Sequence, residues 1–330
     1  MKRVVLVALA LAASAAIAPL RAQSPGQVEA PNVNSNPRGD IYVSVSVGGG
    51  PPVAVIFDTG STGLRMYAPA VGPNIERTGT PVRYGYGSGS AYDGEKAFAV
   101  VKIGPVATAR AVPFELVTDL HCYSKQPNCP GKIGVDAAAR QWKIKGVLGV
   151  ALSGGNGIPS PLSALPAPFD GGFVISHRQV FLGLPDSVER TFKTLQLARL
   201  SPDLATGGAA WKTTLDVWWR VGGNAANGGT PIPTLFDTGN SEATIRVAAG
   251  DVDATLMNGE HLKNGTAVEA TIPGVLDWQF RSGSRPGVDQ VRVALPTRGL
   301  PHANPGWAAF DRYDVMYDAR RGLIGFRPAR

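Results

Sequence analysis

Two short segments of the sequence each carry an aspartate in the same local setting. Val-Ile-Phe-Asp-Thr-Gly-Ser at 55–61 returns as Thr-Leu-Phe-Asp-Thr-Gly-Asn at 234–240, so Asp58 and Asp237 both follow an apolar run and precede Thr-Gly. An apolar strand that ends in such a turn presents a carboxylate at the mouth of a loop, because glycine lets the backbone turn beneath it. One such turn is ordinary loop chemistry. Two copies predict that the aspartates act together.

Two carboxylates that face each other cannot both ionise freely, so they share a proton. One is then an acid while the other is a base, and the pair titrates as a unit. Such a pair can take a proton from water and protonate a leaving group, which is general acid–base hydrolysis. Other catalytic classes find no support, because the sequence has no Gly-x-Ser-x-Gly elbow, phosphate-binding loop or His-Glu-x-x-His motif.

The elements expected to hold these turns are strands. The chain has 41 glycines and 27 prolines that interrupt short apolar runs, which is typical of an all-β protein. Strands are predicted at 41–47, 53–57, 97–103, 180–182, 194–200, 213–221, 268–272, 291–295 and 314–317. One short helix is expected near 160–165.

The repeat predicts two lobes of comparable size. Residues 41–188 are expected to form an N-terminal β lobe that contains Asp58, and residues 189–330 a C-terminal β lobe that contains Asp237. Each lobe then contributes one aspartate to a site between them.

The beginning of the chain has the pattern of a secretory signal peptide, predicted to span 1–22. Two basic residues precede an apolar run from 4 to 18, and Ala22 offers a small residue for cleavage. The alternative is a membrane anchor, but the run is shorter than the roughly 20 residues that a spanning helix needs. Residues 23–40 are rich in Pro, Asn, Ser and Gly and are predicted to be a flexible lead-in. The protein is therefore expected to be secreted or periplasmic, without a membrane anchor.

The two cysteines, Cys122 and Cys129, lie in a polar segment that contains two prolines. In an oxidising compartment they are predicted to form a disulfide. A metal or redox pair is the alternative, but the spacing is not Cys-x-x-Cys and the four histidines form no ligand cluster. Neither a metal nor a cofactor is therefore expected.

Beyond the two turns, the chain resembles the pepsin family of aspartic proteases. Residues 41–61 are similar to the family's opening strand, turn and first active-site loop. Tyr-Gly-Tyr-Gly-Ser at 84–88 resembles the flap, a hairpin that closes over substrate. Further similar segments, in the family's order, are Gly-Val-Leu-Gly-Val-Ala at 146–151, Ser-Pro-Leu-Ser at 160–163, the stretch 211–222, and the closing strands at 313–318 and 323–326. The resemblance implies a bilobal pepsin-like fold with the active-site cleft between two β-rich lobes.

The resemblance also implies a role for each residue of the turns. Asp58 and Asp237 would be the catalytic pair that holds the lytic water, with no covalent intermediate. Support would come from Thr59, Gly60, Ser61, Thr238, Gly239 and Asn240. The threonines would interlock beneath the pair, and Ser61 would bond the first aspartate. Asn240 stands where the family more often has Thr or Ser, and its amide offers a comparable bond. On the flap, Tyr84 and Gly85 would contact substrate.

Three segments depart from the family's pattern. Leu-Arg-Met-Tyr at 64–67 stands where the family often has a tryptophan that bonds the flap tyrosine, which leaves flap positioning open. Ala-Asn-Pro-Gly at 303–306 lies beside the second active-site loop, in place of two aliphatic residues and a glycine. The lead-in is too short for the inhibitory prosegment of secreted eukaryotic members.

These observations predict an aspartic endopeptidase that acts on a peptide or protein substrate and is a monomer. The formal net charge is +7, but the basic residues are scattered, so a nucleic-acid partner is not indicated. One alternative is a catalytically silent binding or inhibitor protein of the cell envelope that keeps this fold. Another is a structural β-sandwich in which the two turns are merely turns. The presence of both aspartates and both threonines favours the enzyme.

Overall fold

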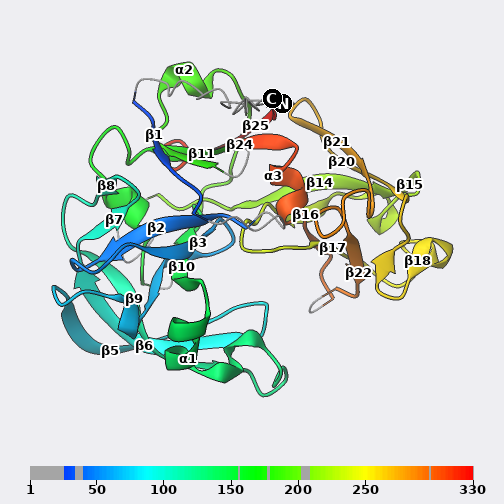
Figure 1. Cartoon of the computed structure of the whole chain (residues 1–330). Helices are drawn as coiled ribbons and strands as arrows, with labels where there is room; N and C mark the ends of the chain where they lie inside the picture. The colour runs from blue at the N-terminus through cyan, green and yellow to red at the C-terminus, as the bar shows by residue number, and fades with distance from the viewer. Residues whose placement is uncertain are drawn as a thin grey trace, which may run out of the picture.

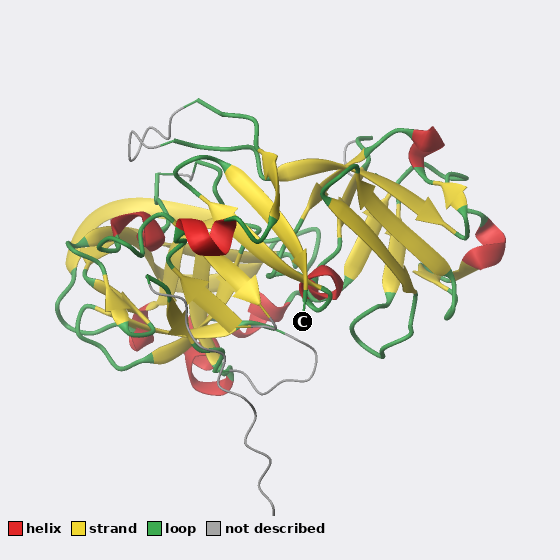
Figure 2. Cartoon of the chain, turned by 90° about the horizontal axis from the view of Figure 1, so that it is seen from above, coloured by secondary structure: helices red, strands yellow, loops and turns green. Residues whose placement is uncertain are grey.

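The computed structural model describes residues 26–33, 40–154, 157–176, 179–201, 209–296 and 299–329. The predicted signal peptide and residues 23–25 and 34–39 of the predicted lead-in lie outside these residues. The described part of the chain is all-β and bilobal, as predicted, with three sheets and only short helices (Figures 1 and 2). Among the described residues, no helix is long and apolar enough to cross a membrane.

A nine-stranded sheet forms the first lobe, drawn in colours from blue to green in Figure 1. Its strands are β2 (Tyr42–Val47), β3 (Val53–Asp58), β4 (Thr62–Tyr67), β5 (Glu76–Gly85), β6 (Ser90–Ala99), β7 (Val101–Ile103), β8 (Val106–Ala107), β9 (Val112–Cys122) and β10 (Ile144–Val150). Their spatial order is β5-β6-β9-β4-β10-β3-β2-β7-β8. Every second side chain of β2 is buried, because one face of the strand packs on the core.

A ten-stranded sheet forms the second lobe, drawn in yellow and orange in Figure 1. Its strands are β14 (Thr214–Val221), β15 (Asn224–Ala225), β16 (Ile232–Leu235), β17 (Ala243–Arg246), β18 (Met257–Asn258), β19 (His261–Leu262), β20 (Ala267–Ile272), β21 (Leu276–Arg281), β22 (Val291–Ala294) and β23 (His302–Asn304). Their order is β18-β19-β22-β17-β23-β16-β14-β20-β21, and β15 pairs with β14. Buried residues again alternate along β14 and β20.

A six-stranded sheet contains strands from both predicted halves. Its strands are β1 (Val28–Ala30), β11 (Gly172–Ser176), β12 (Gln179–Leu182), β13 (Lys193–Gln196), β24 (Tyr313–Asp318) and β25 (Leu323–Pro328). Their order is β1-β12-β11-β24-β25-β13. The expected boundary at 188–189 falls within helix α2 (Asp186–Glu189), which connects two strands of this shared sheet.

The N-terminal lead-in differs from its prediction at residues 28–30. The composition of 23–40 predicted a flexible segment, but β1 pairs antiparallel with β12 and Ala30 is fully buried. The backbone of β12 offers an open edge, and pairing with it satisfies the hydrogen-bonding groups of β1. Composition is a poor guide to such a segment because the partner strand lies far away in the sequence.

The two Asp-Thr-Gly turns are held by the same strand arrangement in each lobe. In the first lobe, β10 runs parallel to β3 and antiparallel to β4, so it crosses between the strands on either side of Asp58. In the second lobe, β23 runs parallel to β16 and antiparallel to β17, on either side of Asp237. The 303–306 segment therefore departs in sequence while keeping the strand that the turn needs.

The helices are short, as predicted. They are α1 (Val135–Gln141), α2, α3 (Trp307–Phe310), and the 3-10 turns η1 (Ala68–Ala70), η2 (Pro130–Ile133), η3 (Pro161–Ala164), η4 (Asn227–Gly229) and η5 (Ala254–Leu256). The helix expected near 160–165 is η3, whereas α1 was not predicted. The strand expected at 97–103 is two strands, because β6 pairs with β9 and β7 pairs with β2. Cys122 and Cys129 form the predicted disulfide, with their Cα atoms 5.5 Å apart.

Candidate active site

The two Asp-Thr-Gly turns meet, and their carboxyl groups face each other. Asp58 is the last residue of β3, and Asp237 follows β16 by two residues. Their side chains share a hydrogen bond. Each turn also lies against the other's carboxylate, because a Cβ on Gly60 would be 2.4 Å from Cγ of Asp237 and one on Gly239 would be 2.6 Å from Oδ1 of Asp58. The glycines thus permit the close approach of the two turns.

Hydrogen-bond donors surround each carboxylate. The backbone N–H of Gly60 donates to Oδ1 of Asp58 over 2.8 Å, and the hydroxyl of Ser61 donates to Oδ2. The backbone N–H of Gly239 donates to Oδ1 of Asp237 over 2.7 Å. These contacts hold both carboxylates in fixed orientations, which a reaction that needs both groups requires.

The threonines interlock beneath the pair. The backbone N–H of Thr59 donates to Oγ1 of Thr238 over 3.0 Å, and the backbone N–H of Thr238 donates to Oγ1 of Thr59 over 3.0 Å. Each hydroxyl in turn donates to a carbonyl of the opposite lobe, that of Phe236 or Phe57. The reciprocal bonds are fully buried, so they fix the two turns relative to each other.

Burial and repulsion make Asp237 hold its proton strongly. Burial raises the pKa of Asp237 well above its usual value, and the nearby charge of Asp58 raises it further. Donation from Asn304 and from the N–H of Gly239 opposes this rise but does not cancel it. The pair therefore keeps one proton at pH values where an ordinary carboxyl has lost it.

Asn304, rather than Asn240, supports the second aspartate. The Nδ2 of Asn304 donates to Oδ2 of Asp237 over 2.8 Å, whereas the Nδ2 of Asn240 donates to the carbonyl of Glu242 over 2.6 Å. The expected bond from Asn240 is therefore replaced by one from the end of β23. The sequence signal was the polar residue at 304, which stands where the family resemblance leads one to expect an aliphatic residue.

Replacing Asn304 with Ala is expected to move the alkaline limb of the pH–rate profile to higher pH and to lower kcat by about tenfold or more. The amide stabilises the ionised form of Asp237, so its loss raises the pKa of that group further. Asn240→Ala is the matched control, and its alkaline limb should stay in place. If the alkaline limb shifts in Asn240→Ala but not in Asn304→Ala, then Asn240 rather than Asn304 supports Asp237.

The flap hairpin lies over the first turn. Strands β5 and β6 form it and pair with β9 through β6. Tyr84 lies near its tip, with its hydroxyl close to Ser61, the residue that bonds Asp58. At Gly85, an added Cβ would lie 1.3 Å from the hydroxyl of Tyr123, so the absence of a side chain allows the flap to approach this tyrosine.

Arg65 occupies the place at which the resemblance predicts a tryptophan. Its guanidinium carbon lies 3.4 Å from the centroid of the Tyr84 ring. Its side chain is 1% exposed and forms an ion pair of 3.1 Å with Glu115, which is fully buried. Burial raises the pKa of Glu115 to about 7, although the Arg65 charge opposes the rise.

The turns and the flap line a cleft of about 940 Å³, and its two walls differ in chemistry. The first-lobe wall is mostly apolar and aromatic and includes Ile56, Tyr84, Tyr86, Tyr92, Trp142 and Val147. The second-lobe wall is polar and includes Glu242, Thr244, Arg246, Arg292, His302 and Asn304. On this wall β17 lies between β22 and β23, with Thr244 opposite both Arg292 and Asn304.

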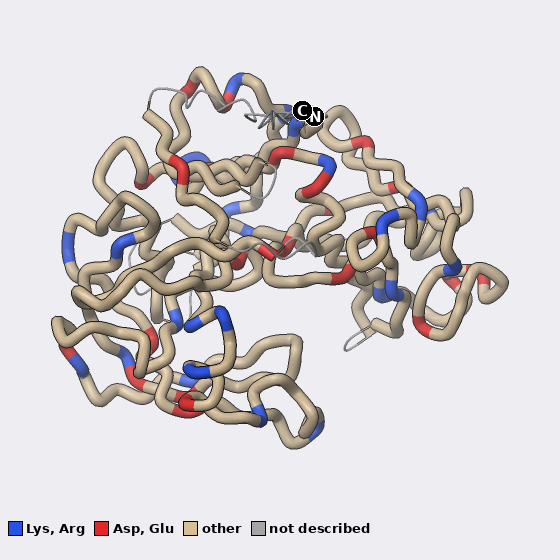
Figure 3. Tube along the Cα trace, viewed as in Figure 1, with Lys and Arg blue, Asp and Glu red and all other residues tan. Residues whose placement is uncertain are grey.

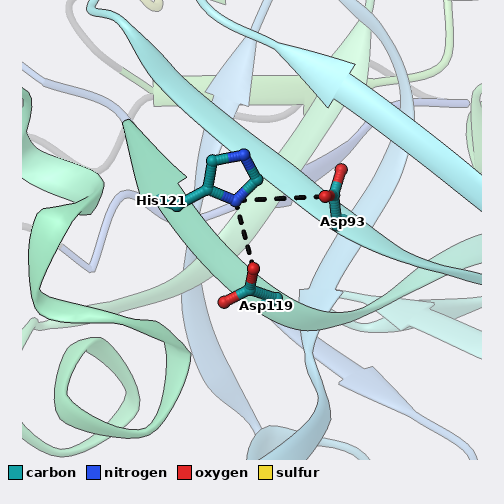
Figure 4. Close-up of side chains that lie close together, drawn as sticks. All are labelled: Asp93, Asp119 and His121. Carbon is teal, nitrogen blue, oxygen red and sulfur yellow. Dashed lines mark hydrogen bonds and ion pairs between the residues drawn. The ribbon is translucent and has the colours of Figure 1, made fainter. Parts of the chain in front are cut away.

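One cluster outside the cleft has metal-ligand chemistry. The ligand atoms of Asp93, Asp119 and His121 lie within 4.8 Å of one another (Figure 4). However, the guanidinium of Arg83 donates to both carboxylate oxygens of Asp93, over 2.6 and 2.7 Å, and lowers the pKa of that group. With a cation already bound to one of the two carboxylates, the cluster is a surface ion-pair network.

Comparison with known proteins agrees with this geometry. A family model described as the PE-PGRS C-terminal aspartyl peptidase-like domain matches residues 32–274, a span that includes Asp58, Asp237 and the flap. A search of curated proteins found no match. Because the family model covers more than half of the sequence, the chain belongs to the PE-PGRS C-terminal aspartyl peptidase-like domain family.

Proposed function

We propose that the protein is a pepsin-type aspartic endopeptidase. The observation that carries this proposal is the Asp58–Asp237 pair, whose carboxyl groups share a hydrogen bond at the base of a cleft. Asp237, whose pKa is raised by burial, holds the proton that the reaction needs, while the N–H of Gly60 and the hydroxyl of Ser61 donate to Asp58. This asymmetry is what an acid–base pair needs.

In the proposed mechanism, the pair holds a water molecule between the carboxyl groups. The ionised carboxylate takes a proton from the water as its oxygen attacks the carbonyl carbon of the peptide. The protonated carboxyl gives its proton to the carbonyl oxygen, which forms a tetrahedral gem-diol intermediate. The pair then gives a proton to the leaving nitrogen, and the C–N bond breaks as one hydroxyl of the intermediate returns its proton to the pair and becomes the new carbonyl. The reaction ends with a new carboxyl terminus, a new amino terminus and the shared proton restored.

The two walls of the cleft favour an asymmetric substrate. The aromatic first-lobe wall suits a large apolar side chain. On the second-lobe wall, Arg292 is paired with Glu260 over 2.6 Å. Among the described residues, the Arg246 side chain bonds only a backbone carbonyl, that of Leu295, over 3.2 Å. Arg246 is thus available to a substrate carboxylate, and peptides with a nearby acidic residue should be preferred.

The compartment and assembly are part of the same proposal. A signal-like segment at 1–22 and a formed disulfide support secretion or a periplasmic location. Basic and acidic residues are interspersed over both lobes of the Cα trace, which supports a peptide substrate over a nucleic acid (Figure 3). Both aspartates belong to one chain, so the proposed enzyme acts as a monomer.

A mixed peptide library tests the proposal. The purified protein should cleave peptides at acidic pH, beside large apolar residues, and pepstatin should inhibit the cleavage. Arg246→Gln should reduce the preference for a nearby acidic residue without abolishing cleavage. No cleavage of any peptide between about pH 3 and pH 7, the range around reference carboxyl values, would instead favour a silent binding protein.

A further inference from the structure

The flap tyrosine is supported by a cation. The guanidinium of Arg65 stacks on the face of Tyr84, at 3.4 Å from the ring centroid, and lies 6.0 Å from the centroid of Tyr86. An aromatic face attracts a cation at such distances, most strongly where water is excluded. Arg65 is almost fully buried, so the contact occurs where it is strongest.

Arg65 also reaches the catalytic turn. Its Nη1 donates to the carbonyls of Thr62 and Gly63, over 3.0 and 3.2 Å. Both residues follow Ser61, which bonds Asp58 and lies close to Tyr84. One side chain therefore links the turn that carries Asp58, the flap, and Glu115 on β9.

The ion pair beneath the flap needs an explanation beyond stability. Transfer of Arg65 and Glu115 out of water costs free energy that their mutual attraction often fails to recover, and an apolar pair of similar volume is often as stable. Neither Nε of Arg65 nor either Oε of Glu115 forms a hydrogen bond of normal geometry. A purely structural role would not require a charged pair at this place.

We propose that Arg65 is a positioning residue for the flap, which holds Tyr84 over Ser61 and Asp58 through its guanidinium, and that Glu115 holds Arg65 in place. Arg65 thus takes over the task of the missing tryptophan by stacking rather than by a hydrogen bond. This inference rests on the proposed peptidase activity for its kinetic consequence. Its structural consequence, an ordered flap, does not depend on catalysis.

The test removes both charges together, because a single substitution would leave the other charge buried and unpaired. Arg65→Met with Glu115→Gln should lower kcat/KM by about 10- to 30-fold, the range that corresponds to a desolvated cation–π contact. Hydrogen exchange of the flap amides in β5 and β6 should become faster. Thermal unfolding checks that the double variant keeps its fold. If the double variant does not fold, Arg65→Lys replaces it in the test, because lysine keeps the charge but lacks the planar group that stacks on Tyr84.

Two substitutions of Tyr84 separate positioning from a structural role. Tyr84→Phe keeps the aromatic face, so adding Arg65→Met with Glu115→Gln to this variant should still lower kcat/KM. Tyr84→Leu removes the face, so the same change should have little further effect. If the double substitution lowers kcat/KM equally in the wild type, in Tyr84→Phe and in Tyr84→Leu, the proposal is overturned, since Arg65 would then act on activity without Tyr84.

The two proposals fail in different ways. If the wild-type protein cleaves no peptide but its flap exchange depends on Arg65 and on the Tyr84 ring, the proposed function is wrong and the positioning role stands. If the protein cleaves peptides and neither its flap exchange nor its kcat/KM responds to the Arg65 and Glu115 change, the positioning role is wrong and the proposed function stands.

Discussion

Replacing either Asp58 or Asp237 with Asn is expected to reduce kcat for peptide cleavage by at least about 100-fold, because general acid–base groups contribute about 10²–10⁴-fold. Each substitution removes half of the pair that shares the proton, and neither amide can take a proton from water. The change in side-chain volume is small, so the folded structure should persist. Initial rates on a soluble peptide, with circular dichroism of each variant, measure both outcomes.

Asp216→Asn is the matched control for these variants. Asp216 lies exposed on β14, so its loss should change the rate by no more than about twofold. If Asp58→Asn or Asp237→Asn keeps activity near that of the control, the two carboxyl groups do not form the catalytic pair. Asp58→Asn and Asp237→Asn are also expected to lower kcat by similar factors, since the effects of groups that act as a unit are not additive.

Gly60→Ala is expected to reduce kcat by about 100-fold as well, although the substitution leaves both aspartates in place. The added Cβ would lie 2.4 to 2.6 Å from the carboxyl atoms of Asp237, so that carboxylate must move. It is held by Gly239 and Asn304, and displacement of a catalytic group by about 1 Å can cost about 10²-fold. Steady-state kinetics on the same peptide would measure the loss.

Gly171→Ala provides the comparison for Gly60→Ala. An added Cβ at Gly171 would meet the end of the exposed Arg320 side chain at 3.2 Å, and this side chain can give way. Its activity should therefore match the wild type. Normal turnover by Gly60→Ala would mean that the two turns are farther apart in solution than the structure places them.

The duplicated turns could be predicted from the sequence because their information is local. An apolar run followed by Asp-Thr-Gly specifies a strand and a turn in each half, and the alternation of apolar residues specifies which face of each strand is buried. The reciprocal threonine bonds follow once the two turns meet. The assignment of Tyr84 to a flap came from the family resemblance of 84–88, and Tyr84 does lie on the β5–β6 hairpin.

Contacts between distant segments could not be predicted in this way. Asn304 bonds Asp237 only because β23 crosses between β16 and β17; the sequence marks residue 304 as unusual for the family but does not place it beside Asp237. The stack of Arg65 on Tyr84 joins β4 to β5 through a side chain that looked like a loss of flap support. For the same reason β1 was taken for a flexible lead-in, since its partner β12 lies about half the chain away.

The pH dependence of cleavage tests the central claim most directly, because it counts the protons on the pair. The active form carries one shared proton, so kcat/KM for a soluble peptide should follow a bell. Below the lower limb a second proton neutralises the base. Above the upper limb the pair loses its shared proton, and the raised pKa of Asp237 places this limb above the range of an ordinary carboxyl. We expect an acidic to mildly acidic optimum with cleavage nearly lost at about pH 9, far above reference carboxyl values. Undiminished turnover at that pH would contradict a proton-sharing aspartate pair.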